Sequence, residues 1–167
     1  FKELEQNTQK SLRSIEADIA KIEKNILVLI KSDKEISRMY EILLSVEGIG
    51  KITAIMFIIN TNAFTTFTCA KKFACYAGVV PFEHKSGTSI KGKSRVSHFS
   101  NKEMKTVLHM CAVSLCHTKG DLGEYYRRKV AEGKNKMSTI NALRNKIVLR
   151  VFACIKSDKL YEKVKLQ

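Results

Sequence analysis

The sequence predicts a mainly α-helical protein, in which a long, coiled-coil-like N-terminal helix precedes a compact helical domain with a helix-hairpin-helix. Three observations support this fold class. Apolar residues recur at helical spacing in the first part of the chain, further stretches carry a helical apolar face, and residues 78–81 are the one short candidate for a strand. The 167 residues suffice for one compact domain and an accessory element. We therefore expect an arm over residues 1–45 and a domain over residues 46–160.

Residues 1–45 have the pattern of a helix that packs along a seam. Their apolar positions alternate three and four residues apart, and Asp33 stands at the one position that breaks the series. Residues 32–35 (SDKE) resemble a capping box, so a second helix is expected to begin there after a kink or short turn. The seam can pack within the chain, but mixed flanking charges and the lack of a later matching helix favour a self-associating coiled coil, and hence a homo-oligomer. The seam residues are Leu12, Ile15, Ile19, Ile22, Ile26, Leu29, Ile36, Tyr40 and Leu43.

Residues 46–60 contain two glycines, Gly48 and Gly50, between the end of one helix and the start of an apolar one. Without side chains they can take backbone conformations barred to other residues, and DNA can approach their amides. The following helix would point its N-terminal amides and the positive end of its dipole at the same place. The pattern favours a helix-hairpin-helix that binds the phosphate backbone through Gly48, Gly50 and Lys51, over a plain helix–helix turn.

Four more helices are expected, over residues 69–77, 102–118, 122–132 and 138–155. The last of them has a mostly apolar face, and Arg144 and Lys146 are expected to lie outside that face. The face consists of Ile140, Leu143, Ile147, Arg150 and Val151.

The net charge of +14 is unevenly distributed. Residues 1–45 carry eight basic and eight acidic side chains, residues 46–105 nine and three, and residues 106–167 thirteen and five. All of the excess follows position 45, which indicates an assembly segment joined to a polyanion-binding domain. Because no run of about 20 apolar residues exists, no membrane partner is expected. Five cysteines without a CxxC pair suit a reducing cytoplasm.

Residues 77–105 interrupt the helical sequence with a basic loop that holds the only proline, three glycines and six hydroxyl side chains before Asn101. Such a loop buries little apolar surface and favours a phosphate-rich partner. Within it, Ser86 and Gly87 fit a nucleophilic attack on a phosphodiester, because serine needs its proton removed, charge neutralised nearby and room for a backbone to approach. The neutralising cations are Lys85, Lys91, Lys93 and Arg95.

Other interpretations of these residues stay open. Ser-Gly is a common turn dipeptide, and no clear general base lies near it, since a histidine such as His84 is more often a surface residue that contacts phosphate. Tyr125 and Tyr126 are alternative nucleophiles, although a tyrosine pair on a helix also fits packing. No metal site is expected, because the candidate ligands do not share one helical face. Those candidates are His109, Cys111, Cys116 and His117.

The order of several short motifs resembles one known family. The chain has GIG within VEGIGKITA, then AGVVP, the pair Ser86-Gly87, an S-x-x-S-N-x-x-x-K run over residues 97–105, and GK at residues 133–134. In this order they resemble the C-terminal domain of insertion-sequence transposases of the DEDD type, the group related to Piv-type DNA invertases. The resemblance covers most of residues 36–155. Each motif is short, and their combination is specific.

The resemblance implies a two-part enzyme of the prokaryotic cytoplasm that acts at the nucleoid. An N-terminal RuvC-like domain, expected outside this chain because the chain starts at Phe1 rather than Met, would bind Mg²⁺ with acidic residues. The C-terminal domain would supply a serine that forms a covalent link to DNA, and Ser86 matches that serine. Asn101 and Lys105 of the motif run are implied DNA-binding residues. DNA is the implied partner, with a guide RNA as an optional second one.

The chain departs from the family pattern at His98, Ser100 and Lys105, where a basic residue, glycine and arginine are usual. Residues 46–105 contain three carboxylates and offer no Mg²⁺ site, so the chain is expected to bind DNA without recombining it alone. The leading hypothesis is therefore DNA binding and strand transfer by a transposase or site-specific recombinase. The alternative is a non-catalytic helix-hairpin-helix module that binds nucleic acid.

Overall fold

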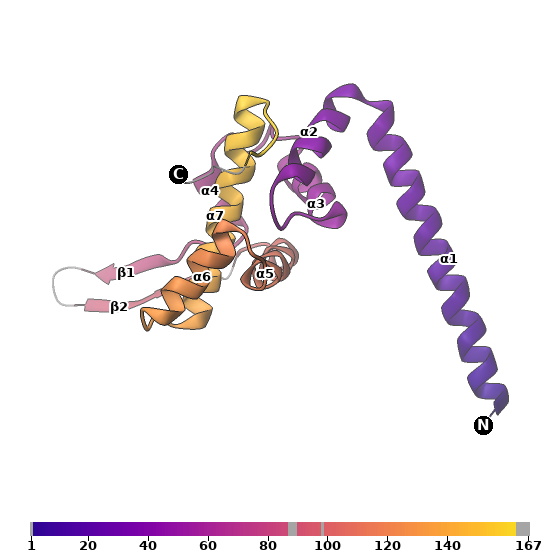
Figure 1. Cartoon of the computed structure of the whole chain (residues 1–167), viewed down its shortest axis with the longest axis horizontal. Coiled ribbons are helices and arrows are strands. Elements are labelled where there is room, and N and C mark those ends of the chain that lie inside the picture. Colours follow the sequence, from indigo (N-terminus) through magenta and orange to yellow (C-terminus); the bar gives the residue numbers. More distant parts are fainter. Residues whose placement is uncertain (1, 87–89, 98, 163–167) are drawn as a thin grey trace. The chain divides into compact units, whose positions relative to one another are not determined.

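The computed structural model describes residues 2–86, 90–97 and 99–162, and the side chains within 7–81, 96–97 and 99–162. The protein is mainly helical, as predicted. It divides into two compact units, Phe1–Arg38 and Met39–Gln167. In order, the described elements are α1 (Lys2–Ser32), α2 (Lys34–Ser45), α3 (Lys51–Thr61), α4 (Ala70–Tyr76), β1 (Phe82–Ser86), β2 (Ile90–Arg95), α5 (Lys102–Cys116), α6 (Asp121–Ala131) and α7 (Lys136–Ser157) (Figure 1).

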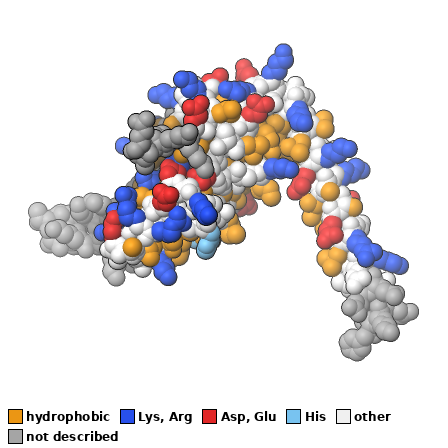
Figure 2. Space-filling view, viewed as in Figure 1, with side chains coloured by type: hydrophobic (Ala, Val, Ile, Leu, Met, Phe, Trp, Pro, Cys, Tyr) orange, Lys and Arg blue, Asp and Glu red, His pale blue; other side chains and the backbone are white. Residues whose placement is uncertain are grey.

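The first unit consists largely of α1, and most of the seam side chains on this helix are exposed. Ile26 is half-buried, and the last two predicted seam residues, Tyr40 and Leu43, are buried on α2. Leu12, Ile15, Ile19 and Ile22 each expose half or more of their surface, and Figure 2 shows apolar side chains along this helix beside both basic and acidic ones. The helix breaks where the sequence predicts. Asp33, rather than Ser32 of the predicted capping box, caps α2, because its Oδ1 accepts hydrogen bonds from the amides of residues 35 and 36 at 2.9 and 3.1 Å.

The second unit is built around α7, which packs against α4, α5 and α6 (Figure 1). Its fully buried side chains, Leu143, Ile147, Val148 and Val151, fill the centre of the core. Phe73 of α4 joins this core to an aromatic cluster, with its ring centroid 5.3 Å from that of Phe57 and 5.4 Å from that of Phe152. Asn135 caps α7 through a hydrogen bond from the Ser138 amide. The two helices that flank the basic loop, α4 and α5, are therefore both packed on this core.

The basic loop contains a β-hairpin that the sequence did not indicate. β1 and β2 pair antiparallel, with a register irregularity between Phe82 and His84. The short strand predicted at residues 78–81 is wrong, because the chain pairs only from Phe82 onward. The sequence does not predict the hairpin, because it lacks the alternating apolar pattern of a half-buried strand.

Arg144 corrects a second expectation. Its side chain is 8% exposed, although it was expected outside the apolar face of α7. Ile140, Arg144 and Val148 follow one another at four-residue spacing, so they share a stripe of the helix. Within the described residues the Arg144 Nε has no hydrogen-bond partner, and burial lowers the pKa of the guanidinium.

In the part of the chain that the structure describes, none of the helices combines the length and apolar character that a membrane crossing requires.

Candidate nucleic-acid interface

The turn between α2 and α3 contains the two predicted glycines, and each has a different reason to be there. Gly48 has a φ of +89°, which side chains rarely adopt, and a Cβ built on it would lie 2.7 Å from a methyl carbon of Leu115. Gly48 is therefore required by the fold. Gly50 has an ordinary φ of −96°, and nothing lies within 4 Å of a Cβ built on it. Its backbone faces open space beside the exposed Lys51.

Gly50 is also the N-cap residue of α3, and it provides no side chain to accept from the first amides of the helix. Those amides and the positive end of the helix dipole meet at the same open position. An anion that approached Gly50 would meet backbone donors and the ammonium of Lys51 together. The turn thus has the chemistry of a phosphate contact, and the contact itself remains a prediction.

The hairpin positions Ser86 at the last residue of β1. In the register, Ser86 lies opposite Ile90 and Lys85 opposite Lys91. Gly87 lies outside the described residues. For Ser86 and the predicted cations Lys85, Lys91, Lys93 and Arg95, the structure describes the backbone alone.

The chain that enters β1 is held by the core. Gly78 adopts a φ of +65°, and a Cβ on it would lie 2.5 Å from Ser100 Oγ and 3.3 Å from a methyl carbon of Val96. The residues before and after the hairpin therefore touch at Gly78. Asn141 of α7 donates from Nδ2 to the carbonyl oxygen of Val79 at 2.9 Å. Together these contacts fix the first root of the hairpin, which we define as residues 78–81.

The second root, residues 96–101, ends in a hydrogen-bonded cluster of Asn60, Tyr76 and Asn101. Asn101 Nδ2 donates to Asn60 Oδ1 at 2.9 Å and to Tyr76 Oη at 2.7 Å, and Tyr76 Oη donates to Asn60 Oδ1 at 2.8 Å. The Asn101 backbone amide donates to the Tyr76 carbonyl oxygen at 2.8 Å. Asn101 Oδ1 caps α5 by accepting from the Met104 amide at 2.8 Å.

This cluster gives Asn101 a structural role, because its amide donors and its oxygen are already engaged within the protein. A contact of Asn101 with DNA remains a prediction. Lys105 lies on the first turn of α5 with a half-buried side chain. Both roots are thus anchored on one core, so the hairpin emerges from it at a defined place.

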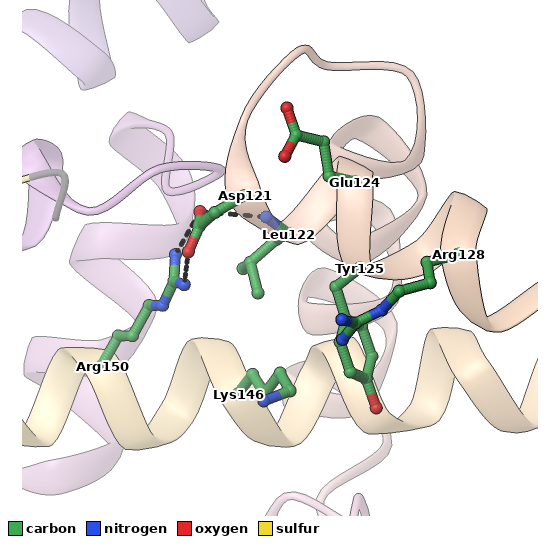
Figure 3. A pocket seen from close by; sticks show the side chains of 7 residues that line it. All are labelled: Asp121, Leu122, Glu124, Tyr125, Arg128, Lys146 and Arg150. Atoms are coloured by element: carbon green, nitrogen blue, oxygen red, sulfur yellow. Dashed lines mark hydrogen bonds and ion pairs between the residues drawn. The ribbon is translucent and has the colours of Figure 1, made fainter. Parts of the chain in front are cut away.

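A pocket of about 320 Å³ lies between α6 and α7, and Tyr125 is among the residues that line it. Figure 3 shows the Asp121–Arg150 ion pair at one end and the Tyr125 ring at the other, with Lys146 between them. The Lys146 ammonium lies 4.7 Å and the Arg128 guanidinium carbon 5.9 Å from the centroid of the Tyr125 ring. Tyr125, an alternative nucleophile by sequence, is thus part of the contact between α6 and α7.

The electrostatics of this pocket favour the ionised form of Asp121. A hydrogen bond from Arg150 is the main cause that lowers the pKa of the Asp121 carboxyl, and the Leu122 amide and Glu47 act in the same direction against the effect of burial. The ring of Tyr161 lies 5.0 Å from the Arg150 guanidinium carbon, and burial is the main cause that raises the pKa of Tyr161. The ion pair therefore joins α6, α7 and the segment after α7.

The cysteines differ in their surroundings. Cys69 is exposed at the start of α4, and the amides of Lys72 and Lys71 lower the pKa of its thiol. Burial raises the pKa of the other perturbed thiols, which belong to Cys111, Cys116 and Cys154. Among the described residues, no group of three or more His, Cys, Asp or Glu side chains is placed to bind a metal ion. These residues therefore do not fit a Mg²⁺ site.

Sequence reasoning missed the residues that support the hairpin, Asn60, Tyr76 and Asn141. Asn60 and Tyr76 are 41 and 25 positions away from Asn101, so no local pattern connects them. The only part of this cluster with a local sequence signal is Asn101, because a Ser-Asn pair before an expected helix is typical of an N-cap.

Comparison with known proteins shows similarity to one transposase family and to several curated proteins. The sequence profile of the family described as "Transposase IS116/IS110/IS902 family" matches residues 40–127, which include the glycine turn, the hairpin and the Asn60–Tyr76–Asn101 cluster. The pilin gene-inverting protein of Moraxella bovis is 27% identical over 157 residues, 93% of this chain and 49% of the relative. A probable family 20 transposase of Pseudomonas aeruginosa is 27% identical over 95% of this chain and 46% of its own length.

A third relative, an uncharacterised protein of the insertion element IS110 in Streptomyces coelicolor, is 28% identical over 72% of this chain and 30% of its own length. The chain thus spans about half or less of the length of these curated relatives.

Proposed function

Because the chain belongs to the transposase IS116/IS110/IS902 family, we propose that it is the DNA-binding and strand-transfer part of a transposase or site-specific recombinase. The observation that carries the proposal is the basic hairpin with Ser86 at the end of β1 and both of its roots held by the core. A nucleophile for a phosphodiester needs a defined position and cations around it. The anchored hairpin supports the first requirement, and its lysines and arginine support the second.

In the proposed reaction, Ser86 Oγ attacks a backbone phosphorus. The hydroxyl proton passes to a base, for which His84 is a candidate, a new P–O bond forms to serine, and the P–O bond to one sugar breaks. The leaving sugar oxygen takes up a proton and becomes a free hydroxyl end. Attack by a sugar hydroxyl of another strand then reverses these steps, reseals the DNA and frees Ser86. The number of phosphodiester bonds is conserved, so the exchange needs no ATP.

The glycine turn is proposed to bind the flanking duplex. Gly50, which faces open space, would admit a phosphate to the first amides of α3, and Lys51 would add a positive charge. Such contacts carry no sequence information, so they would position the duplex without selecting it. Selection of the target would fall to other contacts, for which a guide RNA is a candidate partner.

The arm over residues 1–45 is proposed to join two copies of the chain. The exposed seam on α1 supports this, because a stripe of half-exposed leucine and isoleucine residues at alternating three- and four-residue spacing matches the contact face of a coiled coil. Strand exchange acts on more than one DNA break, which suits an oligomer. Analytical ultracentrifugation of the chain should show an oligomer that Ile15→Glu together with Ile22→Glu dissociates, and a monomeric wild type would exclude this part.

The chain spans about half the length of its relatives. We propose that the rest of the enzyme, including a RuvC-like domain and its Mg²⁺, corresponds to the part of the relatives that this chain does not span. Among the described residues, no group of His, Cys, Asp or Glu side chains fits a metal site.

The proposal is tested in a protein of the relatives' full length that contains this chain. Ser86→Ala should abolish recombination of a plasmid substrate while leaving the affinity for duplex DNA within about threefold of wild type, because the change removes no positive charge. Recombination at wild-type rate by Ser86→Ala would leave the alternative, a non-catalytic module that binds nucleic acid by charge. That alternative also requires binding to DNA that weakens as salt is raised. If this chain shows no such binding, both the recombinase proposal and the alternative are wrong.

A further inference from the structure

Phe99 lies in the second root of the hairpin, and its side chain is 100% exposed. No other large apolar side chain whose exposure the structure describes is left so completely in solvent, since the next values are 68% for Leu29 and 67% for Ile59. Burial of a phenylalanine side chain is strongly favourable. Burial of this ring by a partner would therefore contribute favourably to the free energy of binding.

The backbone around Phe99 holds the ring outward. The Phe99 amide donates to Ser97 Oγ at 3.2 Å, which closes a tight turn. On either side, Val96 and Ser100 pack against Gly78, and the Asn101 amide is bonded to the Tyr76 carbonyl oxygen. Val96, Ser100 and Asn101 thus contact the rest of the protein, and Phe99 lies between these anchored positions.

The charges around Phe99 indicate what covers it. Between positions 91 and 105 the sequence has five Lys or Arg residues and one carboxylate, Glu103. A neutral apolar protein surface over Phe99 would have to bring these cations near apolar groups, at a desolvation cost. A nucleic acid strand offers phosphates to the cations and the flat face of a base to the ring.

We propose that Phe99 stacks on a nucleobase that has left the duplex stack, on a strand held by the hairpin. The inference rests on the proposed nucleic-acid binding of this chain. It goes further by naming an unstacked base as the group that Phe99 contacts. Aromatic stacking accepts any base, so the contact would register an unpaired base rather than a sequence. A base beside a broken or exchanging strand is in this state, which places Phe99 at the step where paired strands separate.

The chain contains no tryptophan, so Phe99→Trp introduces a single tryptophan at the proposed contact, which can be excited selectively over the tyrosines. The variant is titrated with three duplexes of one sequence: fully paired, with one unpaired adenine, and with an abasic site at the unpaired position. Stacking predicts that the unpaired adenine quenches the fluorescence more strongly than the other two duplexes. Met110→Trp, at a 63% exposed position of α5, is the control and should report no difference between the three.

Affinities measured on the same duplexes separate stacking from apolar contact. Phe99→Ala and Phe99→Leu should both lower the affinity for the duplex with the unpaired base by about 5- to 100-fold, the range for loss of one stacked ring. Both should leave the affinity for the paired duplex within about threefold of wild type. Because the side chain is exposed, neither variant should change the melting temperature, which circular dichroism checks.

Wild-type affinity in Phe99→Leu, or equal losses on all three duplexes, would overturn the inference while leaving the proposed function standing. If the wild-type chain binds none of the duplexes, the proposed function fails and this inference fails with it.

Discussion

Replacement of Asn101 by alanine is expected to lower the free energy of unfolding of this chain by about 2–3 kcal/mol. The change removes the side-chain cap of α5, worth about 1 kcal/mol, and two hydrogen bonds, each worth about 0.5–1.5 kcal/mol, from Asn101 to Asn60 and Tyr76. The bond from Tyr76 Oη to Asn60 Oδ1 survives. Since no member of the cluster then lacks every partner, the loss should fall in the lower half of the summed range.

Urea unfolding followed by circular dichroism measures this loss, and Asn101→Asp serves as the matched variant. Aspartate keeps the acceptor for the cap but has no amide donors, so it should cost about 1–2 kcal/mol. Tyr76→Phe removes the shared hydroxyl, and a double-mutant cycle with Asn101→Ala should give a coupling of about 0.5–1.5 kcal/mol. An Asn101→Ala variant within about 0.5 kcal/mol of wild type, or a coupling of zero, would refute the reasoning.

The same variants test how Asn101 affects binding. Because the cluster acts through the hairpin root, Asn101→Ala and Tyr76→Phe should weaken duplex binding by similar factors. A loss confined to Asn101→Ala would contradict this and would point to the α5 cap or to a contact of Asn101 itself with DNA.

Three further predictions follow from the described contacts. Gly48→Ala should cost at least about 1 kcal/mol of stability, since it combines a positive φ with a clash, whereas Gly50→Ala should leave urea unfolding almost unchanged and weaken duplex binding; equal behaviour of the two variants would contradict the separate roles. The lowered pKa of Asp121 means that its stabilising effect is present above its unfolded pKa and is lost as the pH falls through the folded pKa, so thermal melts of Asp121→Asn should depend less on acid pH than those of wild type, and parallel curves would argue against the ion pair. Iodoacetamide near neutral pH should label Cys69 faster than the three thiols whose pKa burial raises, which peptide mass spectrometry can follow; faster labelling of any of those three would contradict the described burial.

The helices of this protein could be predicted because their signals are local. Residues 102–118 were expected as a helix and α5 spans Lys102–Cys116, and residues 138–155 correspond to α7 at Lys136–Ser157. An Asn at each N-cap and an apolar stripe at helical spacing are enough for such a prediction. The four-residue spacing of Arg144 to Ile140 and Val148 also indicates burial. Arg144 was nevertheless expected outside the apolar face, because its side chain is charged.

The hairpin and its anchoring could not be predicted, because they depend on contacts between distant segments. Residues 82–95 carry almost no apolar alternation, so the ladder bonds and the anchored roots have to stabilise the strands. The cluster of Asn60, Tyr76 and Asn101 forms only after α3, α4 and α5 have packed. The sequence could indicate Ser86 as a candidate nucleophile, but not the surroundings that give it a defined place.

The central claim is that Ser86 becomes covalently linked to DNA, and the most direct measurement is the mapping of a trapped adduct. A protein of the relatives' full length that contains this chain is incubated with a nicked substrate that prevents religation, digested, and analysed by mass spectrometry. We expect a nucleotide adduct on Ser86 that disappears in Ser86→Ala. An adduct on Tyr125 or any other residue, or continued recombination without an adduct on Ser86, would contradict it.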